Sequence, residues 1–304
     1  MIGLSVSDDG TRCSICGELA RPGRSIRRPI RFAGQVRHYV RCRECGSLSL
    51  DPMPSDTELA PLYGYEYNSG DNDGLRLESD PRAVDWIMGI VQSLNPDRFV
   101  DYGCGSGELL RRVATTGVEA VGFDLDAAGV EEASLSAGCT AYTYADVGDH
   151  LSTADVLHIG DVLEHVSNPM ALLDEACSLL RPGGTLLVEG PLEANLSVFN
   201  GVLAVASAVK LGRPVEMPPY HVHLITARGQ QRLLGRAGLT CDEFETGDTA
   251  WPAPGRWDPL LVRHPRLLSL FLLRKLSGVA FRFASRKRSD RIANRFRYRG
   301  TKSD

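Results

Sequence analysis

Apolar runs alternate with amphipathic segments through the middle of the chain. Buried strands are predicted for RFVD from residue 98, VEAVGFD from 118, ADVLHIG from 154 and TLLVEG from 185, with another strand just before YADVGDHL. Between the last two runs, Leu172, Leu173, Ala176, Leu179 and Leu180 recur at helical spacing, and a Pro-Gly-Gly break follows. Strands that alternate with helices predict an α/β fold with a doubly wound, mostly parallel sheet. Such sheets bind ligands at the carboxyl ends of their strands.

Two segments interrupt this alternation in the second half of the chain. The first, about residues 192–225, is predicted to contain an apolar helix near 197–210 and then a proline-rich loop, after which Thr226 caps the helix ARGQQRLLGRAG. The second, about 255–292, is apolar and basic. Around it, LTCDEFETGD reads as the sixth strand and NRFRYRGTK as an antiparallel seventh.

The first 60 residues form a separate pattern. CSIC and CREC flank two short β-like runs that meet at Ala33-Gly34. Each C-x-x-C turn brings two thiolates to one centre, and a hairpin between the turns joins the pairs. We therefore predict a zinc ribbon and linker over residues 1–60, and a second domain over 61–304. The zinc ligands are Cys13, Cys16, Cys42 and Cys45.

Four cysteine ligands leave no open coordination position on the ion, so the predicted zinc is structural and not catalytic. A redox C-x-x-C site is the competing interpretation, less favoured because a glycine follows each pair. Many ribbons bind nucleic acid and this one is basic, but only Phe32 and Tyr39 offer stacking rings. We therefore favour a module that stabilises the fold and covers part of a substrate pocket. Nucleic acid is the less favoured partner.

The net charge of −4 conceals an asymmetry. From Gly255 to Asp304, eleven Arg and three Lys face three Asp, giving +11, and the remaining residues sum to −15. An apolar segment ending in basic clusters is typical of helices on anionic membranes, and a packed helix with a solvated Arg edge is the alternative. We find neither a long uncharged apolar run nor a leader pattern, which predicts a cytoplasmic protein, with contact to the inner face of the membrane left open.

The stretch RFVDYGCGSGELL carries the strongest chemical signal. Gly103, Gly105 and Gly107 lie at a strand-to-helix turn, where glycine lets the backbone approach a ligand and the helix N-terminus favours polar groups. A dinucleotide fold requires glycine where this chain has Glu108, so NAD is a minor alternative.

Acidic residues follow the next two predicted strands. Asp124 directly follows VGF and is placed to accept both ribose hydroxyls of a nucleoside-like cofactor, although Asp126 could do so or start the next helix. Asp146 is placed to accept from an adenine amino group, and an N-cap or loop acid is the alternative.

From about Asp80 to Asp248 the chain resembles the class I S-adenosylmethionine-dependent methyltransferases, through VDYGCGSG, VGFDLD, DVLEHV and LRPGGTLLVEGP. The resemblance implies a Rossmann-like, seven-stranded fold and S-adenosyl-L-methionine as cofactor. It places Asp101 and the three glycines at the methionine end, Asp124 at the ribose and Asp146 beside the adenine, and it adds Asp161 to the cofactor site. Relatives with a ribbon tend to methylate sugars, glycans or natural products, which implies a small-molecule or glycan acceptor.

Two histidines are candidate bases for a hydroxyl acceptor. His165 follows the fourth strand, beside the reactive end of the cofactor in this fold, and a structural hydrogen bond is its alternative role. His221, in PPYHVHLIT, matches the substrate-side loop of the family. We assign Tyr220, His223 and Glu164 to the substrate. A metal held by His221 and His223 lacks an obvious third ligand.

The other histidines suggest no chemistry: His158 reads as a core residue, and His38, His150 and His264 as surface residues. We therefore predict an O-methyltransferase for a sugar, a glycan or a related small molecule. RNA methylation, sugar C-methylation and non-enzymatic cofactor binding remain alternatives. The sequence does not determine the oligomeric state.

Overall fold

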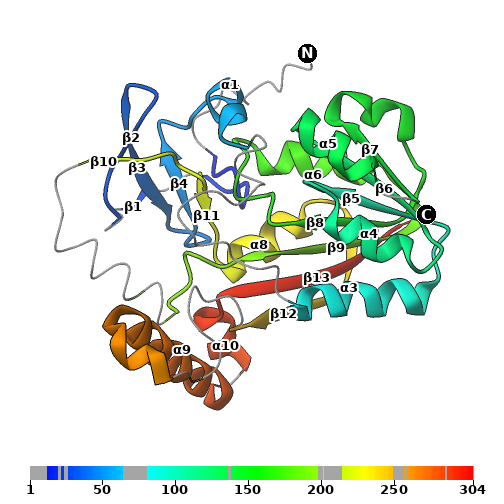
Figure 1. The fold of residues 1–304 in the computed structure, drawn as a ribbon. Helices are drawn as coiled ribbons and strands as arrows, with labels where there is room; N and C mark the ends of the chain where they lie inside the picture. Colours follow the sequence, from blue (N-terminus) through cyan, green and yellow to red (C-terminus); the bar gives the residue numbers. More distant parts are fainter. Residues whose placement is uncertain are drawn as a thin grey trace.

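A computed structural model describes residues 12–19, 22–23, 27–63, 81–135, 138–197, 201, 214–248, 257, 259–284 and 286–303. The described residues form two sheets (Figure 1). The helix expected near residues 197–210 lies almost wholly outside the described residues.

The larger sheet has seven strands in the order β12-β13-β9-β8-β5-β6-β7. Its parallel strands are β5 (Arg98–Tyr102), β6 (Glu119–Asp124), β7 (Cys139–Thr143), β8 (Ala154–Gly160) and β9 (Leu180–Pro191). The strand β13 (Arg295–Lys302) is antiparallel to both β9 and β12 (Leu239–Gly247). The predicted α/β class, the seven strands and the antiparallel seventh strand are confirmed.

Helices cover both faces of this sheet. One face packs against α3 (Pro81–Leu94), α4 (Glu108–Ala114) and α5 (Ala127–Ser134), and the other against α6 (Pro169–Ser178) and α8 (Ala227–Gly235). The side-chain oxygen of Thr226 accepts from Gly229 N and caps α8, as the sequence predicts. The cap therefore marks the residue at which the inserted segment ends and α8 begins.

The sequence predicts a Pro-Gly-Gly break between a helix and the strand TLLVEG, but in the structure these residues lie inside the strand. β9 runs through the break from Leu180 to Pro191, and the pairing with β8 shifts between Ala154 and Val156. Gly183 has φ +73, a conformation that glycine adopts without steric cost. The break is therefore an irregularity within a continuous strand.

The smaller sheet joins the N-terminal module to the inserted segment. Its strands β2 (Ile30–Phe32), β3 (Gln35–Cys42) and β4 (Leu48–Asp51) form the ribbon, with the short β1 (Pro22–Gly23) paired to β3. The β2–β3 turn is at Ala33-Gly34, as expected, and both residues have positive φ. From the inserted segment, β10 (Val215–Glu216) pairs with β2 and β11 (His223–Leu224) with β4. The ribbon and the insertion thus share one sheet.

After β4, the chain continues through α1 (Asp56–Leu59) and η1 (Ala60–Tyr63), and another 3-10 helix, η2 (Tyr144–His150), follows β7. The basic segment forms η3 (Pro259–Arg263), α9 (Pro265–Phe283) and α10 (Arg286–Ile292). Within the described ranges, no helix combines the length and the apolar content needed to cross a bilayer.

Candidate active site

The four predicted zinc ligands converge in the ribbon. Cys13 Sγ lies 4.0 Å from Cys45 Sγ, Cys16 Sγ lies 3.8 Å from Cys42 Sγ, and all four sulfurs are within 4.8 Å of one another. Tetrahedral Zn–S bonds of about 2.3 Å separate the sulfurs by about 3.8 Å. Two sulfur pairs have about this separation, and the others must close by no more than about 1 Å for the four thiols to hold one tetrahedral ion.

The glycine-rich turn follows β5 at the carboxyl end of the sheet. Gly103, Gly105 and Gly107 all have positive φ, and a Cβ on Gly103 would lie 2.4 Å from Val162 Cγ2. Glycine is required at Gly103 because the loop after β8 packs directly on the turn. This contact puts the loop that contains Glu164 and His165 beside the predicted cofactor site.

Asp101 lies at the end of β5, opposite His158 on β8. Its carboxylate Oδ1 is 2.7 Å from His158 Nδ1, and both side chains are buried. Burial by itself lowers the pKa of His158, but the charge of Asp101 and their hydrogen bond raise it above its usual value. His158 is thus a buried histidine, as expected, and it orients Asp101 at the edge of the glycine turn.

The acidic residues after β6 and β7 make mostly backbone contacts. Asp124 accepts from Gly105 N (2.7 Å) and Asp126 N (3.0 Å), which fixes its carboxylate against the glycine turn. Asp126 is the N-cap of α5, as its alternative interpretation predicts. Asp146 accepts from the backbone and hydroxyl of Thr143 in a capping box at the start of η2. Of these acids, Asp124 is tied most directly to the glycine turn.

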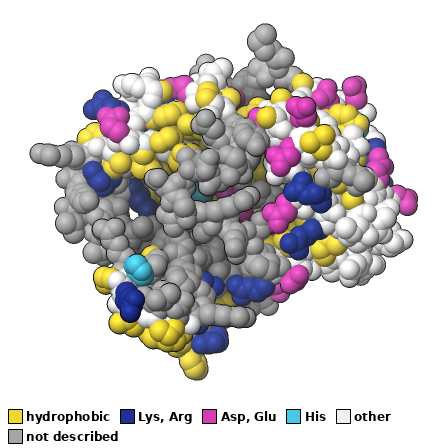
Figure 2. Space-filling view, viewed as in Figure 1, with side chains coloured by type: hydrophobic (Ala, Val, Ile, Leu, Met, Phe, Trp, Pro, Cys, Tyr) yellow, Lys and Arg dark blue, Asp and Glu magenta, His cyan; other side chains and the backbone are white. Residues whose placement is uncertain are grey.

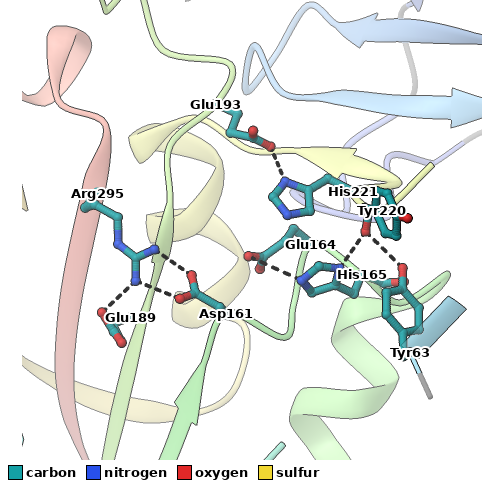
Figure 3. A network of polar contacts seen from close by, with 9 residues as sticks. All are labelled: Tyr63, Asp161, Glu164, His165, Glu189, Glu193, Tyr220, His221 and Arg295. Atoms are coloured by element: carbon teal, nitrogen blue, oxygen red, sulfur yellow. Dashed lines mark hydrogen bonds and ion pairs between the residues drawn. The ribbon is translucent and has the colours of Figure 1, made fainter. Parts of the chain in front are cut away.

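His165 follows β8 in the loop that packs on the glycine turn. Its Nδ1 donates to the carbonyl oxygen of Tyr220 (2.5 Å), which also accepts from Tyr63 Oη (2.9 Å) (Figure 3). Since a carbonyl only accepts, Nδ1 carries the proton and Nε2 carries the lone pair. Burial, followed by the charge of His221, lowers the pKa of His165 to about 4, so the ring is neutral near pH 7.

His221 lies next to His165, with ring centroids 4.7 Å apart in an edge-to-face arrangement. Its Nδ1 is 2.5 Å from Glu193 Oε2, and both side chains are partly exposed. Burial lowers the pKa of His221, but the charge of Glu193 outweighs it and raises the pKa to about 9. In turn, the charge of His221 outweighs burial and lowers the pKa of Glu193. The two residues form an ion pair near pH 7.

Glu164 is the buried member of the group. Its Oε1 lies 3.9 Å from His165 Nε2 and, within the described part of the chain, has no hydrogen-bond partner. Burial, and then the charge of Asp161, raise the pKa of Glu164 to about 8. We call Glu164, His165, His221 and Glu193 the histidine cluster.

An arginine pairs with two acidic residues beside the histidine cluster. Arg295 on β13 donates to both carboxylate oxygens of Asp161 (2.7 and 3.0 Å) and to Glu189 (2.7 Å) (Figure 3). Asp161 also has φ +52, a left-handed conformation that Asp adopts more readily than most residues. This ion pair orients the predicted cofactor residue Asp161.

The structure argues against direct substrate contact by His223. His223 is fully buried, with Nδ1 2.8 Å from Ser49 Oγ and Nε2 3.3 Å from Ser167 O. It ties β11 to the ribbon and cannot reach a ligand without breaking these contacts. The metal pairing of His221 with His223 is excluded by the same contacts.

Sequence reasoning missed Glu193, Tyr63 and Arg295. Glu193 is 28 residues from His221 and Tyr63 is 157 residues from Tyr220 along the chain. No local spacing signals these contacts: Tyr63 and Glu193 reach the cluster through the inserted segment, and Arg295 reaches it from β13 of the larger sheet.

Known proteins resemble this chain over its larger domain. The profile of the methyltransferase domain family matches residues 78–243. The ubiquinone biosynthesis O-methyltransferase of Mesorhizobium japonicum is 30% identical over 190 residues, covering 60% of this chain and 72% of the relative. The enzyme of the same name from Cupriavidus pinatubonensis is 30% identical over 178 residues, covering 54% and 68%.

Among solved structures, an S-adenosylmethionine-dependent methyltransferase from Mesorhizobium loti aligns with 74% of this chain and all of its own, at 16% identity and a TM-score of 0.45. The family profile spans the glycine turn, the acids after β6 and β7, and the loop that contains His165. The chain belongs to the methyltransferase domain family and is an S-adenosylmethionine-dependent class I methyltransferase with a Rossmann-like fold.

Proposed function

We propose that the protein transfers a methyl group from S-adenosylmethionine to a hydroxyl oxygen of a small-molecule acceptor, and that His165 receives the hydroxyl proton. The observation that carries this proposal is the hydrogen bond from His165 Nδ1 to Tyr220 O, which leaves the lone pair on Nε2. A base that removes the acceptor proton typically contributes about 10²–10⁴-fold to the rate.

The donor supplies a methyl carbon made electrophilic by its sulfonium group. The chain has to bind the donor, align the acceptor oxygen with that carbon and exclude water. We assign donor binding to Asp101, Gly103, Gly105, Gly107, Asp124, Asp146 and Asp161. The packing of Val162 on Gly103 supports this assignment, because it joins the predicted donor site to the loop of His165.

The acceptor class is a further proposal. The combination of a ribbon with this fold favours a sugar or glycan hydroxyl. The relatives named for ubiquinone biosynthesis support transfer to oxygen and favour an acceptor of that pathway as the second candidate. We assign Tyr220 and Glu164 to the acceptor side of the site.

Structural zinc in the ribbon is also proposed, because four thiols lie within 4.8 Å of one another and two of the sulfur pairs are at about tetrahedral spacing. Thr226 Oγ1 donates to Cys45 O (2.7 Å), and Ser47 Oγ accepts from Thr226 N (3.1 Å). A zinc-held ribbon would therefore anchor the segment that contains His221.

Contact with an anionic membrane is proposed for α9. Leu272, Leu276, Val279 and Phe283 are exposed along one stripe of this helix, whereas Phe271 and Ser277 are buried. The helix contains Arg and Lys but no acidic residue. In Figure 2, hydrophobic and basic side chains lie together at the lower edge, where Figure 1 places α9. Apolar and basic groups on one helix suit an anionic lipid surface.

The proposal is tested by incubating the purified protein with methyl-labelled S-adenosylmethionine and fractionated cell extract. We expect label in the glycan and sugar fraction, or in the lipid fraction if the second acceptor class is correct. Hot hydriodic acid then releases label bound to oxygen as methyl iodide and leaves C-methyl groups intact. Label in RNA, or label resistant to the acid, would contradict the proposal.

A variant series tests the base. His165→Ala should lower kcat by about 10²–10⁴-fold with little change in S-adenosylmethionine affinity. The control is His38→Ala, on the exposed surface of the ribbon, which should retain full activity. An unchanged kcat in His165→Ala would exclude His165 as the base.

A further inference from the structure

The histidine cluster has the composition of a metal site. One oxygen of Glu164 and one ring nitrogen each of His165 and His221 lie within 4.8 Å of one another. We infer that these three residues bind a divalent transition-metal ion, separate from the four-cysteine site. The inference concerns the site of the proposed function and rests on that function only for the role of the ion, since binding is measured without catalysis. With the ion bound, His165 is a ligand and not the base.

Both histidines are oriented as metal ligands usually are. His165 Nδ1 bonds the carbonyl oxygen of Tyr220, and His221 Nδ1 bonds the carboxylate of Glu193. A ligating histidine almost always gives its second ring nitrogen to a carbonyl or a carboxylate, which fixes the ring and its tautomer. Nε2 is then the coordinating nitrogen of each ring, and His221 releases its Nε2 proton when the metal binds.

Glu164 supplies an independent observation. Its side chain is 3% exposed, and its Oε1 is a buried oxygen without a hydrogen-bond partner among the described residues. A buried carboxylate oxygen left without a partner carries a substantial free-energy cost. Coordination of a cation at that point removes this cost.

The geometry requires the three side chains to close on the ion. Ligand atoms bonded to one ion at about 2.0–2.2 Å lie about 3–3.5 Å apart. The 3.9 Å between Glu164 Oε1 and His165 Nε2 must therefore shorten by less than about 1 Å, and the separations from His221, which are within 4.8 Å, by less than about 2 Å. His221 lies on the inserted segment, which is held by Tyr39 of the ribbon and by Tyr63 of η1. The site is therefore made where the two sheets meet.

The donor set selects the kind of ion. Two imidazoles and one carboxylate suit Mn²⁺, Fe²⁺, Co²⁺, Ni²⁺ or Zn²⁺, whereas Mg²⁺ and Ca²⁺ prefer oxygen ligands. Three protein ligands leave coordination positions open, as in catalytic metal sites.

The ion would change how the acceptor loses its proton. A hydroxyl bound at an open position would ionise more readily, and its proton would pass to water because His165 would use Nε2 to hold the ion. The oxygen electron pair then forms the bond to the methyl carbon as the carbon–sulfur bond breaks, and that bond's electron pair stays on sulfur in S-adenosylhomocysteine.

Mn²⁺ is the probe, because thiolate sites prefer zinc and should keep it. Zinc-containing protein is titrated with Mn²⁺, and the loss of the free-ion electron paramagnetic resonance signal measures binding. We expect one Mn²⁺ per chain, at least tenfold weaker binding in Glu164→Gln and His221→Ala, and a loss of about 10–100-fold in Glu193→Gln. His38→Ala is the matched control and should bind as the parent protein does.

Zinc content and thermal unfolding verify that each variant is folded. Equal Mn²⁺ binding by the parent protein and the Glu164 and His221 variants, no binding by the parent, or displacement by a tenfold excess of Mg²⁺ would each overturn the inference. Mn²⁺ binding without any methyl transfer would refute the proposed function alone. Full methyl transfer in a chelator, without bound Mn²⁺, would refute the role of the ion in catalysis and leave His165 as the base.

Discussion

The phenolic oxygen of Tyr39, on strand β3 of the ribbon, donates a hydrogen bond of 2.5 Å to the carbonyl oxygen of His221. The two residues are 182 positions apart in the chain. The ribbon therefore fixes the backbone at His221, a residue of the proposed active site, in addition to any role in stability.

Removal of this hydrogen bond should weaken acceptor binding. In Tyr39→Phe the aromatic packing is retained and one hydrogen bond is lost, worth about 0.5–1.5 kcal/mol. We expect the KM for the acceptor to rise about 2- to 10-fold with unchanged affinity for S-adenosylmethionine, measured by steady-state kinetics and calorimetry. If the affinity for S-adenosylmethionine changed instead, Tyr39 would act on the cofactor side of the site and not on the acceptor side.

Loss of one thiolate should disrupt the whole ribbon. Cys42→Ser is expected to lose the bound zinc, lower the thermal midpoint and reduce acceptor binding, because the segment from His221 to Thr226 is anchored on the ribbon. Metal content and thermal unfolding measure the effect. The control is Cys241→Ser, an exposed cysteine on β12, and it should change neither quantity. Retained zinc in Cys42→Ser would contradict the four-cysteine site.

A methyl group on the glycine turn should abolish cofactor binding. Gly103 and Gly117 both have positive φ (+92 and +85), so alanine costs about 1–2 kcal/mol of backbone strain at either position. Only at Gly103 would the new Cβ also lie 2.4 Å from Val162, whereas nothing lies within 4 Å at Gly117. Calorimetry should show loss of S-adenosylmethionine binding in Gly103→Ala and near-normal affinity in Gly117→Ala. If both variants lost S-adenosylmethionine binding equally, backbone strain alone, and not the contact with Val162, would account for the loss.

The buried pair of Asp101 and His158 should make stability depend on pH. Although burial lowers the pKa of His158, the charges of Asp101, Glu189 and Asp161 raise it overall above 6.5 in the folded protein. The stabilisation is therefore complete below pH 6.5 and is lost as the pH rises through the folded-state value.

The measurement is the free energy of unfolding of the cofactor-free protein by denaturant between pH 6 and 9. The advantage of the parent protein over His158→Gln should shrink as the pH increases. A difference that is constant with pH, or that grows, would contradict the raised pKa of His158.

The exposed stripe of α9 should govern membrane binding. Leu276→Glu and Phe283→Glu each remove an exposed apolar side chain (61% and 87%) and add a negative charge. In a sedimentation assay we expect each variant to bind phosphatidylglycerol vesicles at least about tenfold more weakly than the parent protein does. The parent protein should bind neutral vesicles little. The control is Leu151→Glu, which changes an exposed leucine that is far from α9 in the sequence. Equal binding by all three variants would remove α9 as the contact surface.

The sequence by itself determined the features that depend on near neighbours. The apolar runs predicted the strands, and the turn at Ala33-Gly34 and the cap at Thr226 lie where they were expected. The glycine turn after Asp101 is one of four motifs that carry the resemblance from which the cofactor was inferred, and the C-x-x-C pairs indicated one four-thiol centre. Each of these signals lies within a few residues, because turns, caps and helix starts are local.

Only the tertiary structure decided which distant residues share the site. His165, His221 and Glu193 meet because the inserted segment adds strands to the ribbon sheet, and that pairing has no local signal in residues 215–216 or 223–224. The sheet order also decided that His158 faces Asp101, and the burial of His223 removed it from the substrate. Backbone pairing between remote strands depends on how the whole chain packs, so residue spacing alone could not predict these contacts.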